Sequence, residues 1–220
     1  METKSVKSKE KLIILGAGQF AEEALDVVTD TGLFEVVSFV EGLDRTQCSK
    51  SIAGVPVTWI DELGRFDRSH MLLCAVGSPK RITFITQVEH LGLRFASVVH
   101  PSARISRVGN VGKDVFISVG AIVGARTTIG DHVIINRAAV IGHHVVIGPY
   151  ATISPGANIG GGARIGQGAY VGIGSIILDH ISVGKGSVVG AGAVVTKDVP
   201  DNVQVLGIPA RVTKSLLEDQ

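Results

Sequence analysis

The sequence predicts an α/β domain followed by a solenoid of six-residue repeats. Up to about residue 100, apolar stretches of strand length alternate with stretches of helical length, which is typical of βαβ units. From residue 105 onward, an Ile or a Val recurs at every sixth position without an insertion. The composition changes at His100-Pro101, where proline disfavours the helical conformation of the preceding residue. The junction between the two domains is therefore expected at residues 100–101.

The first domain is expected to be a small parallel sheet with helical crossovers. Parallel strands need such crossovers because the chain must return from the end of one strand to the opposite end of the sheet, where the next strand starts. The expected strands span residues 11–15, 36–40, 71–76 and 95–99, and the expected helices span residues 20–31 and 79–91.

A glycine-rich turn follows the first expected strand. Residues 16–21 read G-x-G-x-x-A, a pattern that lets backbone approach a phosphate and leaves N–H groups at a helix N-terminus. Glu41 ends the second strand, where a Rossmann unit places an acid for a ribose hydroxyl. A tight turn that merely packs a helix on a strand remains the alternative. A nicotinamide dehydrogenase is disfavoured, because the sheet is short and a solenoid stands where a substrate domain would follow.

The solenoid is predicted from the period of its apolar residues. A period of six returns to the same face of a strand, whereas a helix with 3.6 residues per turn cannot keep that phase. Small residues recur four places after the aliphatic residue, as at Ala121 and Ala139, and glycine often follows it directly, as at Gly124 and Gly142. The aliphatic ladder consists of Ile105, Val111, Ile117, Val123, Ile129, Ile135, Ile141, Ile147, Ile153, Ile159, Ile165, Val171, Ile177, Val183, Val189 and Val195.

Composition and charge exclude several classes of partner. The 220 residues carry 21 basic and 20 acidic side chains, a net charge of +1, so no nucleic-acid-binding face is expected. The apolar run that follows the polar N-terminus, residues 12–15, is too short for a signal peptide or a membrane span. Cys48 and Cys74 have no disulfide-type spacing and are expected to be reduced thiols. A cytoplasmic protein without a membrane partner is expected.

Four stretches together resemble one family. They are the GAGQFA turn at 16–21, the HPSA junction at 100–103, the hexads, and the closing VTKDVPD at 195–201 with LGIPAR at 206–211. They resemble the bacterial sugar acyltransferases, which include UDP-4-amino-sugar N-acetyltransferases, GDP-perosamine N-acetyltransferase and sialic acid O-acetyltransferases. The resemblance extends from Lys11 to Val212.

This resemblance implies a domain plan and a set of ligands. It implies a polar tail over residues 1–10, a Rossmann-like domain that binds a nucleotide-linked sugar over 11–100, a left-handed parallel β-helix with three hexads per coil over 101–199, and a C-terminal tail over 200–220. It also implies acetyl-CoA as co-substrate, an amino sugar linked to a nucleotide as acceptor, and a homotrimer.

The same resemblance assigns site residues. Sugar-nucleotide contacts fall on Gly18, Gln19, Phe20, Glu41 and Gly77. The catalytic histidine of the family stands in a hexad of the form N-x-x-x-[VIL]-[IL]-x-H, which residues 136–143 match. Asn136 is therefore assigned to substrate binding and His143 to general base catalysis. Contacts with acetyl-CoA fall on Thr152, Ile173 and Ala191, and the stacking of the coils adds Gly161.

A physical argument also favours His143. If eighteen residues make one coil, Gly160-Gly161-Gly162 stacks beside Gly142-His143-His144. With about 4.8 Å between strands, the imidazole would then lie beside a shallow bare groove suited to a pantetheine arm. The alternative is that glycine-rich coils simply stack well and His143 is a solvated surface residue.

Two positions depart from the family pattern. The acid that usually follows the catalytic histidine is replaced by His144, so either another group orients His143 or the two histidines share the task. Thr152 stands where the family has a histidine that contacts acetyl-CoA, and its hydroxyl could still make one hydrogen bond there.

A zinc site like that of the hexapeptide-repeat carbonic anhydrases is an alternative role for the histidines. His144 and His180 are thirty-six residues apart, which is two coils, but Lys185 occupies the place of the third ligand and His132 does not replace it. No metal is therefore expected. The sequence predicts an acetyl-CoA-dependent N-acetyltransferase in which the amino group of a nucleotide-linked 4-amino-4,6-dideoxy sugar attacks the thioester directly. A sugar O-acetyltransferase of the sialic acid type and a non-catalytic trimeric scaffold are the alternatives.

Overall fold

The computed structural model describes residues 8–78 and 81–217, and it divides into two compact units. The first unit holds the described residues up to Val76 together with residues 83–96. The second holds the described residues of 77–82 and those from Ser97 onward. Residues 1–7 and 218–220 of the expected tails, and residues 79–80 of the expected second helix, lie outside the described residues.

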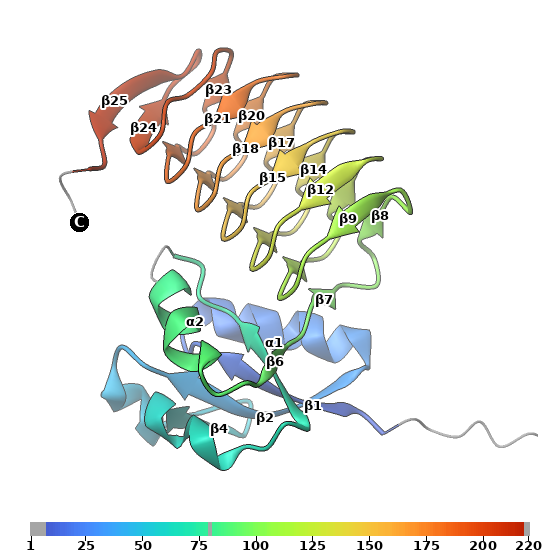
Figure 1. The fold of residues 1–220 in the computed structure, drawn as a ribbon, viewed down its shortest axis with the longest axis vertical. Coiled ribbons are helices and arrows are strands. Elements are labelled where there is room, and N and C mark those ends of the chain that lie inside the picture. Colours follow the sequence, from blue (N-terminus) through green and yellow to red (C-terminus); the bar gives the residue numbers. More distant parts are fainter. Residues whose placement is uncertain (1–7, 79–80, 218–220) are drawn as a thin grey trace, which may run out of the picture. The chain divides into compact units, whose positions relative to one another are not determined.

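The first unit is built on a six-stranded sheet in the order β3-β4-β2-β1-β5-β6 (Figure 1). Strand β1 lies in the interior and pairs in parallel with β2 on one side and β5 on the other. Residues 12–15 of β1 are fully buried, as an apolar run without alternation requires. The elements are β1 (Glu10–Leu15), α1 (Gln19–Thr31), β2 (Phe34–Glu41), η1 (Arg45–Ser49), β3 (Ser51–Ile52), β4 (Val55–Trp59), η2 (Ile60–Arg65), β5 (His70–Cys74), α2 (Arg81–Glu89) and β6 (Arg94–Phe95).

Helix α1 follows the glycine-rich turn, as expected. It buries Ala21, Ala24, Val27 and Val28, whose spacing places them on one face of the helix. It ends at Gly32, which adopts the left-handed conformation with φ 66° and donates its N–H to the Thr29 carbonyl. No helix among residues 8–78 and 81–217 combines the length and the hydropathy needed to cross a bilayer.

The structure differs from the prediction in two places within and beside this unit. The segment between β2 and β5, for which no element was predicted, forms η1, β3, β4 and η2. The strand expected over residues 95–99 is divided between β6 and β7, and β7 belongs to the second unit. The reason is that Val99 pairs with Ile117, so the chain has already entered the first coil of the solenoid. The sheet, which is parallel apart from the antiparallel pair β3–β4, and its crossover helix are compatible with a Rossmann-like domain.

The second unit is a coil of three parallel sheets. Ile117 pairs with Ile135, Ile135 with Ile153 and Ile153 with Val171, so one coil takes eighteen residues. The coils stack in sequence order from green to red in Figure 1. This arrangement fits the expected left-handed β-helix. The first sheet contains β7 (Val98–Val99), β10 (Phe116–Ile117), β13 (Ile134–Ile135), β16 (Thr152–Ile153), β19 (Tyr170–Val171) and β22 (Val188–Val189).

The other two sheets repeat the same geometry. The second contains β8 (Arg104–Ile105), β11 (Ile122–Val123), β14 (Val140–Ile141), β17 (Asn158–Ile159), β20 (Ile176–Ile177) and β23 (Val194–Val195). The third contains β9 (Gly109–Val111), β12 (Thr127–Ile129), β15 (Val146–Ile147), β18 (Arg164–Ile165) and β21 (Ser182–Val183). From Ile117 to Val195 the ladder residues are buried in one core together with the small residues at the coil corners. Val111, in the first coil, is 42% exposed.

The expectation of a C-terminal tail over residues 200–220 is wrong for its described part. Residues 203–215 form β24 (Val203–Leu206) and β25 (Arg211–Ser215), which extend the first sheet. Strand β24 pairs in parallel with β22, and β25 pairs antiparallel with β24. Val205 lies opposite Val189 although the six-residue spacing has ended, because a sheet needs aligned strands and not a constant loop length.

Candidate active site

His143 and His144 lie at the corner that follows β14. The His143 carbonyl accepts the N–H of Gly162 at 2.8 Å, and Gly142 donates to the Ile159 carbonyl at 2.8 Å. His144 has φ 58°, so the chain turns sharply there. The predicted stacking of Gly160-Gly161-Gly162 on Gly142-His143-His144 is thus confirmed.

The three glycines are nevertheless covered by side chains, which corrects the expected bare groove. A Cβ on Gly161 would lie 2.7 Å from Cε1 and 2.9 Å from Nε2 of His143, so the imidazole ring rests directly on this glycine. A Cβ on Gly162 would lie 2.5 Å from Nδ1 of His180, and a Cβ on Gly160 would touch the carboxylate of Asp179. The absence of side chains on 160–162 therefore makes room for His143, Asp179 and His180.

The two adjacent histidines contact each other. Nδ1 of His143 lies 3.0 Å from Nδ1 of His144, and the rings meet edge to face at 87°. One of these nitrogens must donate a proton to the other. If Nδ1–H of His143 donates, its Nε2 carries the lone pair that a general base needs. His144 is therefore placed to hold the orientation of the His143 ring, and both residues are exposed.

Asp179 is a member of this corner that the sequence reasoning missed. Its Oδ1 accepts the N–H of Gly161 at 2.6 Å. The signal was present, because Asp179 stands eighteen residues after Gly161 and thirty-six after His143. Similar bonds brace other corners: Asp131 accepts from Lys113 N–H at 2.8 Å, and Asp201 from Lys185 N–H at 2.7 Å.

A groove adjoins this corner on the outer side of β17 and β20. Its walls are formed by residues 158–160 and 176–179, and its volume is about 500 Å³. Ile176 and Leu178 are 41% and 44% exposed there, so the groove is partly apolar. Its size falls within the range of small-molecule sites.

The other residues assigned from the resemblance lie elsewhere on the coil. Asn136 is buried at the corner after β13, one corner before His143, and no hydrogen bond among the described residues joins the two. Ile173 and Ala191 stack along that same earlier corner, where Gly192 N–H donates to the Ile173 carbonyl at 2.8 Å. Ile173 is 58% exposed. One protomer therefore does not gather Asn136, Ile173 and Ala191 around His143.

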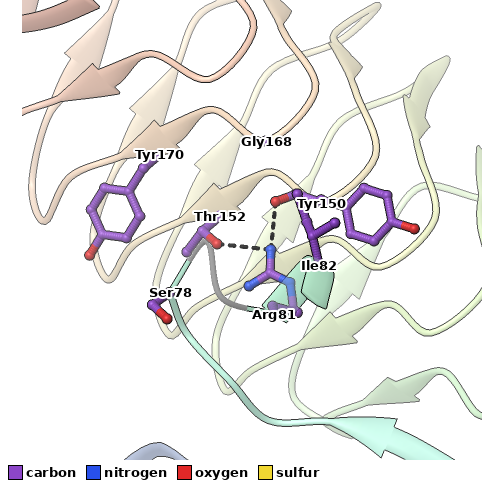
Figure 2. Close-up of a pocket in the computed structure, with 7 residues that line it drawn as sticks. All are labelled: Ser78, Arg81, Ile82, Tyr150, Thr152, Gly168 and Tyr170. Carbon is purple, nitrogen blue, oxygen red and sulfur yellow. Dashed lines mark hydrogen bonds between the residues drawn. The ribbon is translucent and has the colours of Figure 1, made fainter. Parts of the chain in front are cut away.

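Thr152 is occupied by an arginine of the same unit (Figure 2). Nη2 of Arg81 donates to the Tyr150 carbonyl at 2.6 Å and to Oγ1 of Thr152 at 3.1 Å. Arg81 is 2% exposed and Thr152 is 6% exposed. The adjoining cavity, of about 20 Å³, has room for one water molecule. The hydroxyl that was expected to contact acetyl-CoA is thus engaged within the protein.

In the first unit, the assigned residues Gly18, Gln19, Phe20 and Glu41 lie at the carboxyl ends of two neighbouring parallel strands, β1 and β2. The chain leaves β1 toward β2 on one side and β5 lies on the other, which is a switch point of the type where ligands bind in α/β sheets. Gly16 has φ 111°, and a Cβ there would lie 3.0 Å from the Ala75 carbonyl oxygen. A Cβ on Gly18 would meet no atom within 4 Å.

Glu41 has a structural partner that the sequence did not reveal. Its Oε1 accepts the N–H groups of Gly42, Leu43 and Asp44 at 2.9, 2.7 and 3.3 Å. The side chain closes the loop after β2 and leaves the residue 8% exposed. Gly77, the remaining assigned residue, follows β5 and belongs to the second unit.

Two side chains beside this loop, Asp44 and Cys48, have shifted pKa values. Hydrogen bonds from the Gln47 and Thr46 side chains hold the pKa of Asp44 below its ordinary value. Burial raises the pKa of the Cys48 thiol, and the carboxylates of Glu41 and Glu62 raise it further. A thiol with a raised pKa is a poor nucleophile. Among the described residues, no three His, Cys, Asp or Glu side chains converge on a point that could hold a metal ion.

Comparisons with known proteins agree with this architecture. The family described as bacterial transferase hexapeptide (six repeats) matches residues 127–161 and 162–197. No curated protein matches the chain. The chain is 27% identical to PerB, a perosamine N-acetyltransferase from Caulobacter crescentus whose structure contains CoA and GDP-perosamine. The TM-score is 0.86, over 93% of this chain and 97% of that chain.

Two further solved structures have the same extent of similarity. The acetyltransferase domain of PglB from Neisseria gonorrhoeae is 30% identical with a TM-score of 0.84, over 93% of this chain and all of that chain. The same domain has also been solved in complex with acetyl coenzyme A. WeeI from Acinetobacter baumannii is 26% identical with a TM-score of 0.84, over 92% of this chain and 99% of that chain.

Proposed function

Because this chain belongs to the hexapeptide-repeat family of bacterial sugar acyltransferases, we propose that it transfers an acetyl group from acetyl-CoA to the amino group of a nucleotide-linked 4-amino-4,6-dideoxy sugar. The similarity covers nearly the full length of PerB and of the PglB domain, whose structures contain CoA with GDP-perosamine and acetyl coenzyme A, respectively. The observation that carries the proposal is the His143 ring, which rests on Gly161 with Nδ1 bonded to His144.

The proposed chemistry needs one base. The neutral amine attacks the carbonyl carbon of the thioester, a C–N bond forms, and the C–S bond breaks. Nε2 of His143 takes one proton from the attacking nitrogen and returns it to the departing CoA thiolate, which balances the reaction. The resulting imidazolium is stabilised because its Nδ1–H still donates to His144. No acyl-enzyme is required, which agrees with the raised pKa of Cys48.

We assign the nucleotide part of the acceptor to the switch point of the α/β unit. Gly18, Gln19 and Phe20 begin α1 there, and the N-terminus of a helix favours a phosphate group. The open space beside Gly18 supports this assignment. Glu41 shapes the loop after β2, so its contribution to nucleotide binding runs through the position of that loop.

A homotrimer explains why the assigned CoA contacts are dispersed in one protomer. Gly161 lies at one corner of the coil, Ile173 and Ala191 lie at another, and Thr152 lies on a face. Packing of identical solenoids side by side would bring different corners of two copies together. The exposed apolar side chains Ile122 and Val140 of the second sheet would be covered in such an assembly.

Turnover of a substrate panel tests the proposal. Purified protein is incubated with acetyl-CoA and with UDP-, GDP- and dTDP-linked 4-amino-4,6-dideoxy sugars, and the acetylated product is measured by mass spectrometry. Each amino sugar is paired with its 4-hydroxyl analogue. Acetylation of an amino sugar but not of its analogue is expected, and preferential acetylation of the hydroxyl compounds would instead identify a sugar O-acetyltransferase.

Substitution of His143 tests the mechanism. His143→Ala should lower kcat by about 10²- to 10⁴-fold, the usual contribution of a general base, while the Kd for CoA stays near normal. His90→Ala, which removes an exposed histidine of the α/β unit, is the control and should leave kcat unchanged. Unchanged turnover of His143→Ala would show that His143 is not the base.

A further inference from the structure

The corner of His143 contains an anionic side chain to which the mechanism above gives no role. Asp179 binds Gly161 N–H through Oδ1 alone, and the residue is exposed. Within residues 8–78 and 81–217, no Lys, Arg or His nitrogen lies within ion-pair distance of its carboxylate. Its second oxygen, Oδ2, accepts no hydrogen bond from the described residues. A carboxylate with a free oxygen of this kind can accept a hydrogen bond from a cationic group.

Asp179 and His143 approach the same residue from opposite sides. His143 lies in the coil before Gly161 and places its ring on that glycine. Asp179 lies in the coil after Gly161 and takes its N–H at 2.6 Å. The backbone positions of His143 and Asp179 are about 10 Å apart, since each coil adds about 4.8 Å. Both side chains point toward Gly161, which lies between them. An ammonium nitrogen donates hydrogen bonds of about 2.9 Å along directions about 110° apart, so it can join two acceptors that lie roughly 5 Å from each other.

The surroundings also suit a small ligand. Gly160 and Gly161 carry no side chains between the two groups, and the groove of about 500 Å³ ends at Gly160 and Asp179. Asp131 accepts a backbone N–H in the same way, from Lys113, but its corner contains neither His143 nor this groove. Asp179 therefore combines the ordinary corner brace with a location beside the proposed base.

We propose that Asp179 binds the ammonium group of the acceptor sugar and thereby selects amino sugars over sugars with a hydroxyl group. This inference rests on the proposed N-acetyltransferase function and adds the group that sets its specificity. The acceptor arrives as an ammonium ion paired with Oδ2, and one proton leaves to solvent before the neutral amine attacks. A hydroxyl group carries no charge and gains much less from the carboxylate, because hydrogen bonds between two charged groups are the stronger ones.

Binding measured without turnover tests this role. Isothermal titration calorimetry is performed on protein saturated with CoA, which lacks the acetyl group, so no reaction follows. The ligands are the panel amino sugar that wild-type protein acetylates fastest and its 4-hydroxyl analogue. We expect wild-type protein to bind the amine about 10- to 100-fold more tightly, the range of a hydrogen bond to a charged group. A wild-type ratio near one would already overturn the inference, whatever the variants do.

Two matched variants complete the experiment. Asp179→Asn keeps an oxygen that can accept Gly161 N–H but removes the charge, and it should bring the amine-to-hydroxyl ratio near one while the Kd for CoA changes less than about twofold. Asp131→Asn makes the same change at a corner with the same brace and should keep the wild-type ratio. If Asp179→Asn keeps that ratio, the role of Asp179 is limited to its hydrogen bond with Gly161 N–H. If wild-type protein acetylates no amino sugar of the panel, the proposed function itself fails.

Discussion

The solenoid and the α/β unit differ in how regularly their strand pairings recur along the sequence. In the solenoid, every ladder residue pairs with the residue eighteen positions away, and the same contact recurs from Ile117 to Val189. In the α/β unit, Leu15 pairs with Val40 on one side and Cys74 on the other, and neither spacing recurs in another pair of parallel strands of that sheet. A contact that repeats leaves a period in the sequence, whereas a contact that is made once leaves none. Three substitutions test this difference.

The largest expected effect is in the core of the solenoid. Val171→Ala removes two methyl groups from a fully buried site and should lower the free energy of unfolding by about 2 to 3 kcal/mol, from lost burial plus the cavity. Val111→Ala is the same truncation at a ladder residue that is 42% exposed, and it should cost less than about 1 kcal/mol. Chemical denaturation followed by circular dichroism measures both. Equal losses would show that the contribution of a ladder residue to stability does not depend on its burial.

A smaller effect is expected at Gly161, on the corner where His143 is proposed to act. Gly161→Ala places a methyl group 2.7 Å from Cε1 of His143, so the ring must move, and kcat should fall about 10- to 100-fold. Its thermal unfolding midpoint should change little, because the new Cβ meets the flexible His143 side chain. Gly142→Ala is the contrast, since its Cβ would lie 2.7 Å from the backbone nitrogen of Gly161 and should lower stability. Full activity in Gly161→Ala would contradict the contact between the His143 ring and Gly161.

The smallest effect is expected in the α/β unit. Glu41→Ala removes the acceptor of three loop N–H groups and should cost about 1 to 2 kcal/mol of unfolding free energy, with weaker binding of the nucleotide sugar as the loop loosens. Glu35→Ala, at an exposed position of the same strand, should have no effect on either quantity. Denaturation and calorimetry measure the two responses. If nucleotide affinity falls while stability is unchanged, Glu41 contacts the ligand directly.

The fold of the solenoid was predictable down to its register. Eighteen residues per coil placed Gly160-Gly161-Gly162 on Gly142-His143-His144, and the hydrogen bond from Gly162 to His143 confirms it. The ladder could even have been extended backward, because Val99 stands six residues before Ile105 and pairs with Ile117. Its forward end was missed, since β24 joins the sheet after the spacing has changed.

The α/β unit was predictable only in its strongest elements. Strand β1 and helix α1 follow from an apolar run and a glycine-rich turn, both of which are local signals. The short strands β3 and β4 were missed because two to five residues carry too little pattern. Glu41 was assigned to a ligand, yet its carboxylate faces the backbone of its own loop, and no pattern in the sequence indicates which way a side chain turns.

By itself, the sequence determined the repeating architecture, the family resemblance and the identity of the histidine pair, because period and motif are properties of the order of residues. Only the tertiary structure decided what covers the three glycines, that Nδ1 of His143 meets Nδ1 of His144, that Arg81 engages Thr152, and that Asp179 reaches Gly161. Side-chain direction and the competition among partners for one hydrogen bond depend on every neighbour in space. The register of a solenoid determines which residues are neighbours, but their packing determines where each side chain points and which hydrogen bonds it makes.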